Sequence, residues 1–346
     1  MTRNDVIVVG AGIAGSTSAA LLGRQGFSVL LLDRALFPRE KICGEGLMPA
    51  GAAILQELGV LQELSRQGAR PFQGIHFCLP GENRVALNFR EVSETASGWI
   101  TPRVTLDSCL VRLAQRQPGV TFRQGFAVQS IKITTQGVRV EGLCEGIRHT
   151  YTAKALVGAD GIHSRFHRGF GIRRHSLSFQ RFALSAQYSH FKGPRDIVEV
   201  HCCRAGEAYV APLGTGRARI TLLLFKPACS ASHPRLADFY FEHLKLFPEL
   251  MRQVKNPYPK GPIGSTSPVS LQLSRCHASR LILVGDAAGA VDPVTGQGMT
   301  IALKDAQLAC RVLERQLPSG QLSSPDLAPY STQREAYFRP SFNLAQ

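Results

Sequence analysis

The sequence predicts an α/β protein whose nucleotide-binding part has a Rossmann-like order of strands and helices. Three glycine-and-acid motifs, far apart in the chain, carry this prediction. They are Gly10-Ala-Gly12-Ile-Ala-Gly15, Ala159-Asp160-Gly161, and Gly285-Asp286 followed by Gly296-Gln-Gly298. In this order the motifs are typical of a chain that holds one extended dinucleotide at its two ends and its middle. We therefore expect a flavoprotein.

The first motif stands where a strand turns into a helix. Residues 6–9 are apolar and β-branched, which predicts a buried strand of a parallel sheet, and residues 13–24 carry Ala and Leu at helical spacing. Gly10 allows the tight turn, Gly12 lets the backbone approach a pyrophosphate, and Gly15 lets the helix pack closely on the strand. The helix N-terminus then presents free N–H groups and a positive dipole end to the phosphates.

A second strand is predicted at residues 28–32, and Asp33 closes it. An acid in this position can accept hydrogen bonds from a ribose diol. The order of strand, glycines, helix, second strand and acid is far more specific for dinucleotide binding than the glycines alone.

The motifs together make residues 5–315 resemble the FAD-dependent aromatic hydroxylases of the para-hydroxybenzoate hydroxylase type and their relatives, the geranylgeranyl reductases. The resemblance implies a glutathione-reductase-type FAD-binding fold with an interleaved β-sheet substrate domain. It implies FAD-binding segments at 1–72, 98–175 and 276–330, substrate-domain segments at 73–97 and 176–275, and a C-terminal tail at 331–346. No clear apolar period appears after Tyr337, so we expect either a truncated form or a reduced cover over the pocket.

The resemblance also assigns roles at the cofactor. Segment 158–165 would help to hold the FAD pyrophosphate and a visiting NAD(P)H, and Asp286 would bind flavin ribityl or ribose hydroxyls. Residues 296–298 would pass beneath the isoalloxazine, and a helix at 299–313 would point its N-terminus at the flavin. The residues expected at the cofactor are Gly10, Gly12, Ala14, Gly15, Asp33, Arg34, Lys41, Cys43, Gly44, Arg103, Asp160, Gly161, Gly285, Asp286, Gly296, Gly298 and Met299.

Segment 41–49, Lys-Ile-Cys-Gly-Glu-Gly-Leu-Met-Pro, is the most distinctive local feature. Its Lys-x-Cys-Gly resembles the geranylgeranyl reductases, in which the cysteine faces the reaction site. We expect Cys43 and Pro293 as catalytic residues, since a polarizable thiol near flavin could donate a proton or steer the substrate. A buried, merely apolar cysteine is the alternative. Arg39 or Lys41 could instead neutralise the pyrophosphate.

The substrate domain is predicted to contain a hairpin. Residues 208–212 and 218–225 read as strands around Gly214-Thr-Gly216, and residues 236–246 read as an amphipathic helix on them. By resemblance this sheet forms the substrate pocket. The stretch that leads to Arg103 resembles a family segment whose arginine approaches the flavin, and we expect Thr105 to be the N-cap of the helix that follows.

Composition limits the partners and the compartment. The formal net charge is +15, but the basic residues are spread along the 346-residue chain, which argues against nucleic acid. A positive surface would suit an acidic carrier protein or an anionic membrane face, and it would equally serve solubility alone. The nine cysteines form no C-x-x-C, so we expect free thiols in the cytoplasm and no metal. No apolar run is long enough for a transmembrane helix, and no signal peptide is seen, so a place at the inner membrane face would be peripheral.

These observations predict an FAD oxidoreductase that NAD(P)H reduces without a second dinucleotide domain. The preferred reaction is oxygen-dependent hydroxylation of an aromatic or polyketide-like molecule, which the Gly-Gln-Gly version of the last motif favours. The main alternative is hydride transfer to an isoprenoid double bond, with Cys43 or a neighbour supplying the proton. A single tryptophan, and no lysine between Lys41 and Lys132, argue against halogenation. A non-catalytic escort protein on the same fold is the remaining alternative, and the intact Asp160 and Asp286 argue against it.

Overall fold

A computed structural model of the chain describes residues 4–81, 83–175, 181–225, 235–255 and 258–343. The chain forms two compact units. The first contains Met1–Arg39, Leu106–Ser176 and Ser270–Gln346, and the second contains Glu40–Thr105 and Leu177–Val269. The domain boundaries given above remain a prediction. Cys229, the predicted boundary at 176 and the last three residues of the predicted tail lie outside the described residues.

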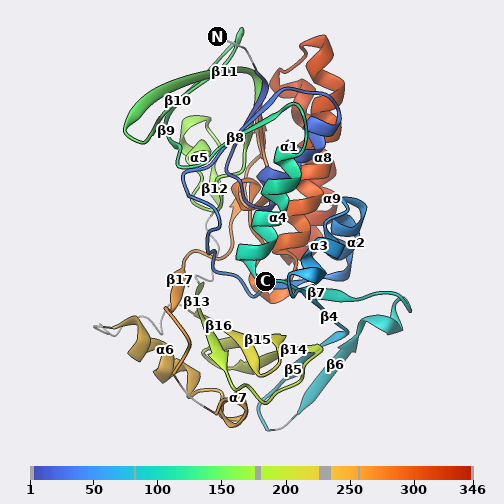
Figure 1. The fold of residues 1–346 in the computed structure, drawn as a ribbon, viewed down its shortest axis with the longest axis vertical. Coiled ribbons are helices and arrows are strands. Elements are labelled where there is room, and N and C mark those ends of the chain that lie inside the picture. The colour runs from blue at the N-terminus through green and yellow to red at the C-terminus, as the bar shows by residue number, and fades with distance from the viewer. Residues whose placement is uncertain (1–3, 82, 176–180, 226–234, 256–257, 344–346) are drawn as a thin grey trace. The chain divides into compact units, whose positions relative to one another are not determined.

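The first unit is built on an eight-stranded sheet (Figure 1). Its main path runs in the order β19-β20-β11-β1-β2-β8, and β10 and β9 extend it from β11. The pairs from β20 to β8 along this path are parallel, which fits the continuous apolar runs of β1 and β2. The strands are β1 (Asn4–Val9), β2 (Val29–Leu32), β8 (Val120–Arg123), β9 (Ala127–Thr134), β10 (Gly137–Cys144), β11 (Ile147–Gly158), β19 (His277–Ala278) and β20 (Leu281–Leu283).

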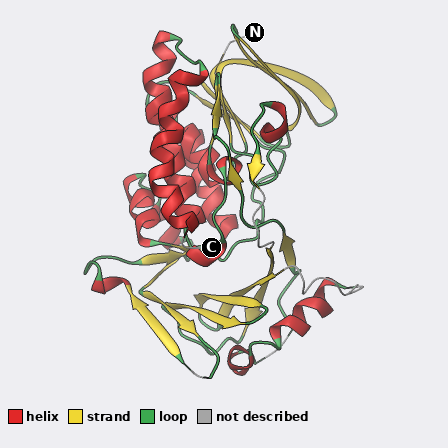
Figure 2. Cartoon of the chain, turned by 180° about the vertical axis from the view of Figure 1, so that it is seen from behind, coloured by secondary structure: helices red, strands yellow, loops and turns green. Residues whose placement is uncertain are grey.

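Helices cover this sheet in a layer, which Figure 2 shows in red from behind. Helix α1 is buried along most of its length because it packs between β1 and the long helix α8, and α8 in turn packs on α9. The helices and short turns are α1 (Ile13–Arg24), α4 (Arg103–Gln115), α5 (Phe166–Gly169), η3 (Gly285–Ala288), η4 (Pro293–Thr295), α8 (Gly298–Ser319) and α9 (Ser324–Asn343). A two-stranded pair, β12 (Arg174–His175) with β18 (Gln272–Leu273), completes the unit.

The second unit is built on a seven-stranded sheet of order β17-β13-β16-β15-β14-β5-β6. Helices α6 and α7 pack on one face of this sheet and share a core with alternate residues of β13, β15 and β16. The strands are β5 (Gly74–Cys78), β6 (Arg84–Asn88), β13 (Arg181–Ser189), β14 (Ile197–Cys203), β15 (Gly206–Gly214), β16 (Arg217–Phe225) and β17 (Gly264–Thr266), and the helices are α6 (Leu236–Leu244) and α7 (Pro248–Gln253).

A small three-stranded sheet of order β3-β7-β4 also belongs to the second unit. Its central strand, β7, pairs with both neighbours in antiparallel fashion, so residues 46–47 lie beside residues 99–100. The remaining elements are β3 (Gly46–Leu47), α2 (Pro49–Glu57), α3 (Leu61–Arg66), β4 (Arg70–Phe72), η1 (Phe89–Glu91) and β7 (Gly98–Ile100).

Most predicted elements are confirmed. The first helix has the predicted bounds, and β15 and β16 form the predicted antiparallel hairpin. The N-cap prediction is wrong, because α4 begins at Arg103 and the backbone N–H of Thr105 already donates to the carbonyl oxygen of Pro102. The predicted C-terminal tail is also wrong as far as Asn343, since these residues are the second half of α9 and bury Phe338 and Phe342.

None of the helices that the structure describes has the length and apolar character required to cross a membrane.

Candidate cofactor and active site

The three sequence motifs of the first unit meet at the carboxyl ends of neighbouring strands. The backbone N–H of Gly10 donates to the carbonyl oxygen of Leu32 at 2.7 Å, which fixes the turn after β1 beside the end of β2. The N–H of Ala159 donates to Val9 at 2.8 Å, and the N–H of Val284 donates to Gly158 at 2.9 Å. Because ligands of open parallel sheets bind outside these strand ends, the arrangement fits the predicted cofactor site.

Gly12 and Gly15 of the first motif have different structural roles. A Cβ atom on Gly15 would overlap the carbonyl oxygen of Gly10, so Gly15 serves close packing of α1 on the turn. Within the part of the chain that the structure describes, a Cβ atom on Gly12 would meet only the end of the Arg39 side chain, 3.3 Å away. The space in front of Gly12 is therefore open to a bound group, in the place where the motif predicts a pyrophosphate.

Asp33 fixes the glycine turn from the second strand. Its Oδ2 accepts a hydrogen bond from the N–H of Ala11 at 2.7 Å, and its Oδ1 accepts one from the N–H of Ala35 at 2.8 Å. Each carboxylate oxygen retains a second lone pair, so the predicted hydrogen bonds to a ribose remain a proposal. The structure adds a role that the sequence did not suggest, which is to hold both backbone segments in place.

Arg39 is the basic residue that lies at the glycine turn. Its Nη2 is 3.2 Å from Oδ2 of Asp107, whose side chain is fully buried, and the same guanidinium faces Gly12. Arg34 and Lys41 are exposed. Of the two residues that could neutralise a pyrophosphate, Arg39 is thus held in a suitable position by a buried carboxylate.

The middle motif carries a buried acceptor. Oδ2 of Asp160 accepts a hydrogen bond from the N–H of Arg165 at 3.1 Å, whereas Oδ1 is buried and has no hydrogen-bond partner of normal geometry among the described residues. Burial raises the pKa of Asp160, although Ser164 and Arg165 act in the opposite direction. Since buried polar atoms are nearly always satisfied, Oδ1 fits a hydrogen-bond donor of a bound cofactor.

The last motif is held by a buried charged cluster that the sequence did not predict. Oδ2 of Asp305 accepts a hydrogen bond from the N–H of Gly285 at 2.9 Å. Arg334 donates through Nε to Oδ1 of Asp305 at 2.9 Å and through Nη2 to the carbonyl oxygen of Gly289 at 3.1 Å, and the hydroxyl of Tyr337 donates to Asp305 at 2.6 Å. The loop that carries Asp286 is therefore held by α8 and α9 together.

Other residues around the last motif have varied exposure. Met299 is buried, Asp286 is half-buried, and Pro293 and Gly298 are exposed. Gly296 has a left-handed backbone with a φ of +64°, which suits the glycine found there. His167, another residue that the sequence did not assign, places its Nε2 2.9 Å from the carbonyl oxygen of Ala287 and so joins the middle motif to the last.

The remaining predicted site residues, Lys41, Cys43, Gly44 and Arg103, belong to the second unit. The pairing of β3 with β7 brings segment 41–47 beside the stretch that leads to Arg103, and the N–H of Thr101 donates to the carbonyl oxygen of Glu45 at 3.0 Å. Cys43 is half-buried, and its Sγ accepts a hydrogen bond from the N–H of Glu45 at 3.4 Å. Arg103 is buried.

Glu45 is the unexpected member of this group. Its side chain is only 1% exposed, and its Oε1 is 3.0 Å from Nε of Arg219 on β16. Burial raises the pKa of Glu45 to about 7, although Arg219 and, more weakly, the Arg103 backbone N–H act to lower it. A carboxyl with a pKa near 7 can exchange a proton at physiological pH, which is the property required of a general acid or base.

Replacing Glu45 with Gln should change how stability depends on pH. Because the folded-state pKa lies above the ordinary value of 4.5, the contribution of Glu45 to stability is complete below pH 4.5 and is lost as the pH rises through about 7. The shift corresponds to roughly 3 kcal/mol. When the pH is raised from 4.5 to 8, the unchanged protein should lose about this much unfolding free energy and E45Q should not. The stability of E45Q relative to the unchanged protein should therefore increase by about 3 kcal/mol over this range.

Urea denaturation at both pH values, followed through the single tryptophan Trp99 on the neighbouring strand β7, measures this difference. Exposed Glu57 on α2 provides the matched control, because E57Q should show no comparable change with pH. A stability difference between E45Q and the unchanged protein that stays constant with pH would contradict the raised pKa.

Comparison with known proteins identifies the family. A family model described as an FAD binding domain matches residues 3–340. The chain belongs to the FAD-binding domain family. FAD is therefore its cofactor, and the protein is an FAD-dependent oxidoreductase.

Relatives in the FAD-binding domain family include both oxygenases and reductases. A kynurenine 3-monooxygenase of Salinispora arenicola is 29% identical over 97% of this chain and 77% of its own length. A menaquinone reductase of Mycolicibacterium smegmatis is 28% identical over 90% of this chain and 76% of its own length. A digeranylgeranylglycerophospholipid reductase of Methanothermobacter thermautotrophicus is 26% identical over 95% of this chain and 82% of its own length.

Solved structures support the fold. The myxobacterial chondrochloren halogenase, described as an FAD-dependent halogenase, matches with a TM-score of 0.90 and 24% identity over 99% of this chain and 82% of its own. At this identity the likeness concerns the fold alone. Since this chain belongs to the FAD-binding domain family, the open space in front of its Gly12 suits the pyrophosphate of FAD. The buried Oδ1 of Asp160 suits a hydrogen-bond donor group of FAD.

Proposed function

We propose that this enzyme is an NAD(P)H-dependent monooxygenase that hydroxylates an aromatic or polyketide-like small molecule. The reaction consumes substrate, O2, NAD(P)H and a proton, and it yields hydroxylated substrate, NAD(P)+ and water. Bound FAD would supply the redox chemistry that links oxidation of NAD(P)H to reduction of O2.

The observation that carries this proposal is a row of hydroxyl groups on the seven-stranded sheet. The Oγ of Ser185 and the Oγ1 of Thr221 are 2.9 Å apart and buried, and Tyr209 pairs with Thr221 on the next strand. Side chains alternate along a strand, so these groups lie on the face opposite α6 and α7, whose core contains Ile220 and Leu222. Hydroxyls give this face of the sheet a polar character, which suits the polar substituents of an aromatic ring better than a long, wholly apolar isoprenoid chain.

The residues of this chain would act by binding, orienting and proton exchange. Gly12 and Arg39 would hold the pyrophosphate, and Asp160 would accept a hydrogen bond from the cofactor. Glu45 would hold the exchangeable proton at Oε2, because Oε1 is taken by Arg219. With a pKa of about 7, this carboxyl can accept a proton from an acidic substituent of the substrate and return it later in the cycle.

The experiment is an isotope-labelling assay on the purified, FAD-loaded protein. NADPH or NADH and 18O2 are supplied with a panel of phenols, anilines and hydroxylated polyketides. We expect one panel member to stimulate NAD(P)H oxidation and O2 uptake equally, and its product to carry one labelled oxygen atom. A product that gains two hydrogen atoms in the absence of oxygen would overturn the proposal.

A second candidate function is the reduction of an isoprenoid double bond. The observation that favours it is a thiol two residues from a carboxyl with a pKa of about 7, in a segment where the backbone N–H of Glu45 donates to Sγ of Cys43. Either group could supply the one proton that each turnover of the reaction needs. Two of the relatives described above are named reductases, which supports the same candidate.

Replacing Cys43 with Ser should separate the two functions. The half-buried thiol accepts one backbone hydrogen bond, which a serine oxygen can also accept, so C43S should keep its FAD. A hydroxylase should also keep its turnover. In a reductase that uses the thiol as its general acid, C43S should lower the turnover rate by about 10²–10⁴-fold. C202S is the matched control, because Cys202 is a half-buried thiol on the seven-stranded sheet. Loss of FAD from C43S would contradict the expected result.

A further inference from the structure

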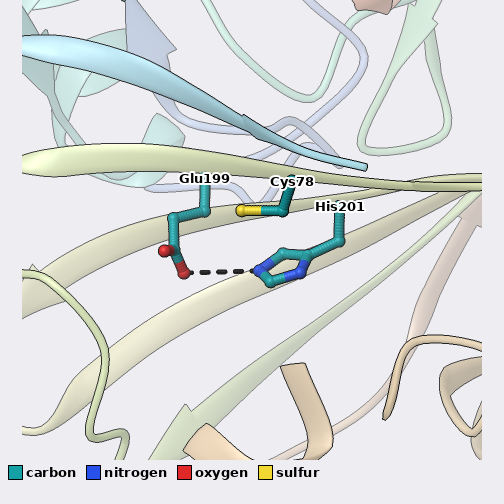
Figure 3. A group of neighbouring side chains, drawn as sticks. All are labelled: Cys78, Glu199 and His201. Carbon is teal, nitrogen blue, oxygen red and sulfur yellow. Dashed lines mark hydrogen bonds and ion pairs between the residues drawn. The ribbon is translucent and has the colours of Figure 1, made fainter. Parts of the chain in front are cut away.

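We propose that Cys78, Glu199 and His201 form a zinc-binding site in the second unit (Figure 3). The site lies on the face of the seven-stranded sheet that α6 and α7 cover, so it is distinct from the hydroxyl-lined face of that sheet. It does not depend on the proposed reaction or on FAD.

Strand pairing places the three side chains together. Strands β5 and β14 are parallel neighbours, and Cys78 is paired with His201 in their register. Glu199 and His201 are two residues apart on β14 and therefore point to the same face. The thiol sulfur, a carboxylate oxygen and an imidazole nitrogen all lie within 4.8 Å of one another, and the exposed fractions are 4%, 1% and 4%.

The cluster contains more acceptors than donors. Oε2 of Glu199 has two polar neighbours, His201 Nε2 at 3.3 Å and Gln253 Nε2 at 3.0 Å. Oε1 of Glu199 and Oε1 of Gln253 are buried and accept no hydrogen bond of normal geometry among the described residues. The nearest guanidinium, Nη2 of Arg84, is 3.5 Å from Oε1 of Glu199 and belongs to a side chain that is half exposed. A buried cation would provide a close partner for these two Oε1 oxygens, which have no hydrogen bond of normal geometry within the described part of the chain.

The ligand types select zinc. Thiolate, imidazole and carboxylate are the three kinds of ligand that Zn²⁺ accepts, and ions that prefer oxygen alone would not select a thiol. Zinc binding would break the S–H bond of Cys78, form a Zn–S bond and release the proton to solvent. The ion with one thiolate and one carboxylate is electrically neutral, which suits a buried position.

The fourth ligand position and the entry route lie on the side of α7. A cavity of about 330 Å³ adjoins the cluster and is lined in part by Cys78, Arg84, Glu249 and Gln253. Oε1 of Gln253 or a water molecule in this cavity would complete a tetrahedral set. Arg84 could turn towards Glu249 when zinc enters, because half of its side chain is already in solvent.

The test measures zinc on the 346-residue, FAD-loaded protein after removal of any histidine tag. The protein is stripped with EDTA and titrated with ZnCl2 in a calorimeter, and its metal content is measured after dialysis. We expect one Zn²⁺ per chain. X-ray absorption of the zinc complex should show one sulfur neighbour at about 2.3 Å together with nitrogen or oxygen neighbours near 2.0 Å.

Three variants and a control make the assignment specific. C78S, E199Q and H201Q should each weaken zinc binding by about 100-fold or more. C202S is the matched control, because Cys202 follows His201 on β14 and points to the opposite face. Arg84→Gln should leave zinc affinity unchanged or raise it, since the guanidinium competes with the cation.

The outcomes separate zinc binding from a metal-free network. FAD content and thermal unfolding in EDTA show that each variant is folded before zinc is added, and only variants that match the unchanged protein are compared. No zinc bound by the unchanged protein would overturn the proposal, as would C202S weakening zinc as much as C78S. Loss of zinc binding in R84Q would also overturn the proposal. That result would mean that the cluster depends on the Arg84–Glu199 ion pair and that Arg84 does not compete with a bound cation.

Discussion

Replacing Gly12 with Val should abolish FAD binding and leave the protein folded. Among the described residues, the flexible end of Arg39 alone lies within 4 Å of a Cβ atom at this position, so the valine side chain would displace the cofactor and not the protein. The expected result is a colourless, soluble protein whose thermal unfolding resembles that of the unchanged apoprotein. Flavin content after purification, and titration of the apoprotein with FAD, measure the effect.

Gly15→Val is the matched control for this result. A Cβ atom at position 15 would overlap the backbone carbonyl of Gly10, which cannot give way as a side chain can. We therefore expect G15V to lose its fold together with its FAD. If G12V purified yellow with full flavin content, the glycine turn would not be the pyrophosphate site.

Replacing Arg334 with Met should strongly destabilise a protein that still folds. Arg334 is 3% exposed, and it supplies the positive charge for Asp305, which is fully buried. Removing one partner of a buried ion pair leaves an uncompensated charge and typically costs about 3–5 kcal/mol. The loop at 285–289 would also lose the hydrogen bond from Arg334 to Gly289, so FAD affinity should fall together with the free energy of unfolding.

Urea denaturation with and without FAD measures both losses. Arg339, on the same helix, forms an exposed ion pair with Glu335, and R339M should change the unfolding free energy by less than about 1 kcal/mol. The double variant D305N/R334M should lose less than the sum of its single variants, because each removes the partner of the other. Equal stability of R334M and R339M would contradict the assigned role of the cluster.

The parts of the fold that follow from local pattern could be predicted from the sequence. The glycine turn, α1 and the β15–β16 hairpin each depend on residues that are close together in the chain, and each has the predicted form. The order of the three motifs also predicted a dinucleotide-binding protein, which the family confirms.

Two helix starts were missed although the sequence carries signals for them. Pro102 directly precedes α4, and proline is tolerated in the first turn of a helix, so the helix could begin before Thr105. Ser323 and Asp326 have the spacing of a capping box before α9, and the N–H of Ser323 donates to Oδ2 of Asp326 at 2.9 Å. The rest of α9 was not predicted because the helix contains two prolines and its apolar residues have only a weak helical period.

The parts of the site that depend on burial could not be predicted. Glu45, Asp305 and Arg334 are ordinary charged residues in the sequence, and only the packed structure shows that they lose contact with water. The same holds for Cys78 and His201, whose proximity depends on the pairing of β5 with β14. A pKa near 7 or a ligand cluster is a property of this packing, and no short motif records it.

The order of strands in the first unit has a consequence for how the protein is made. Strand β11 lies between β1, at the start of the chain, and β20, which begins at Leu281. A ribosome therefore releases β1 and its glycine turn early, but residues 156–158 of β11 have no neighbouring strand on their second side until β20 has been synthesised. Arg334, which holds the last loop, follows later still. While β20 is still missing, the nascent chain therefore has an incomplete nucleotide site and unpaired backbone groups at the end of β11, and unpaired strand edges of this kind favour pairing with other chains.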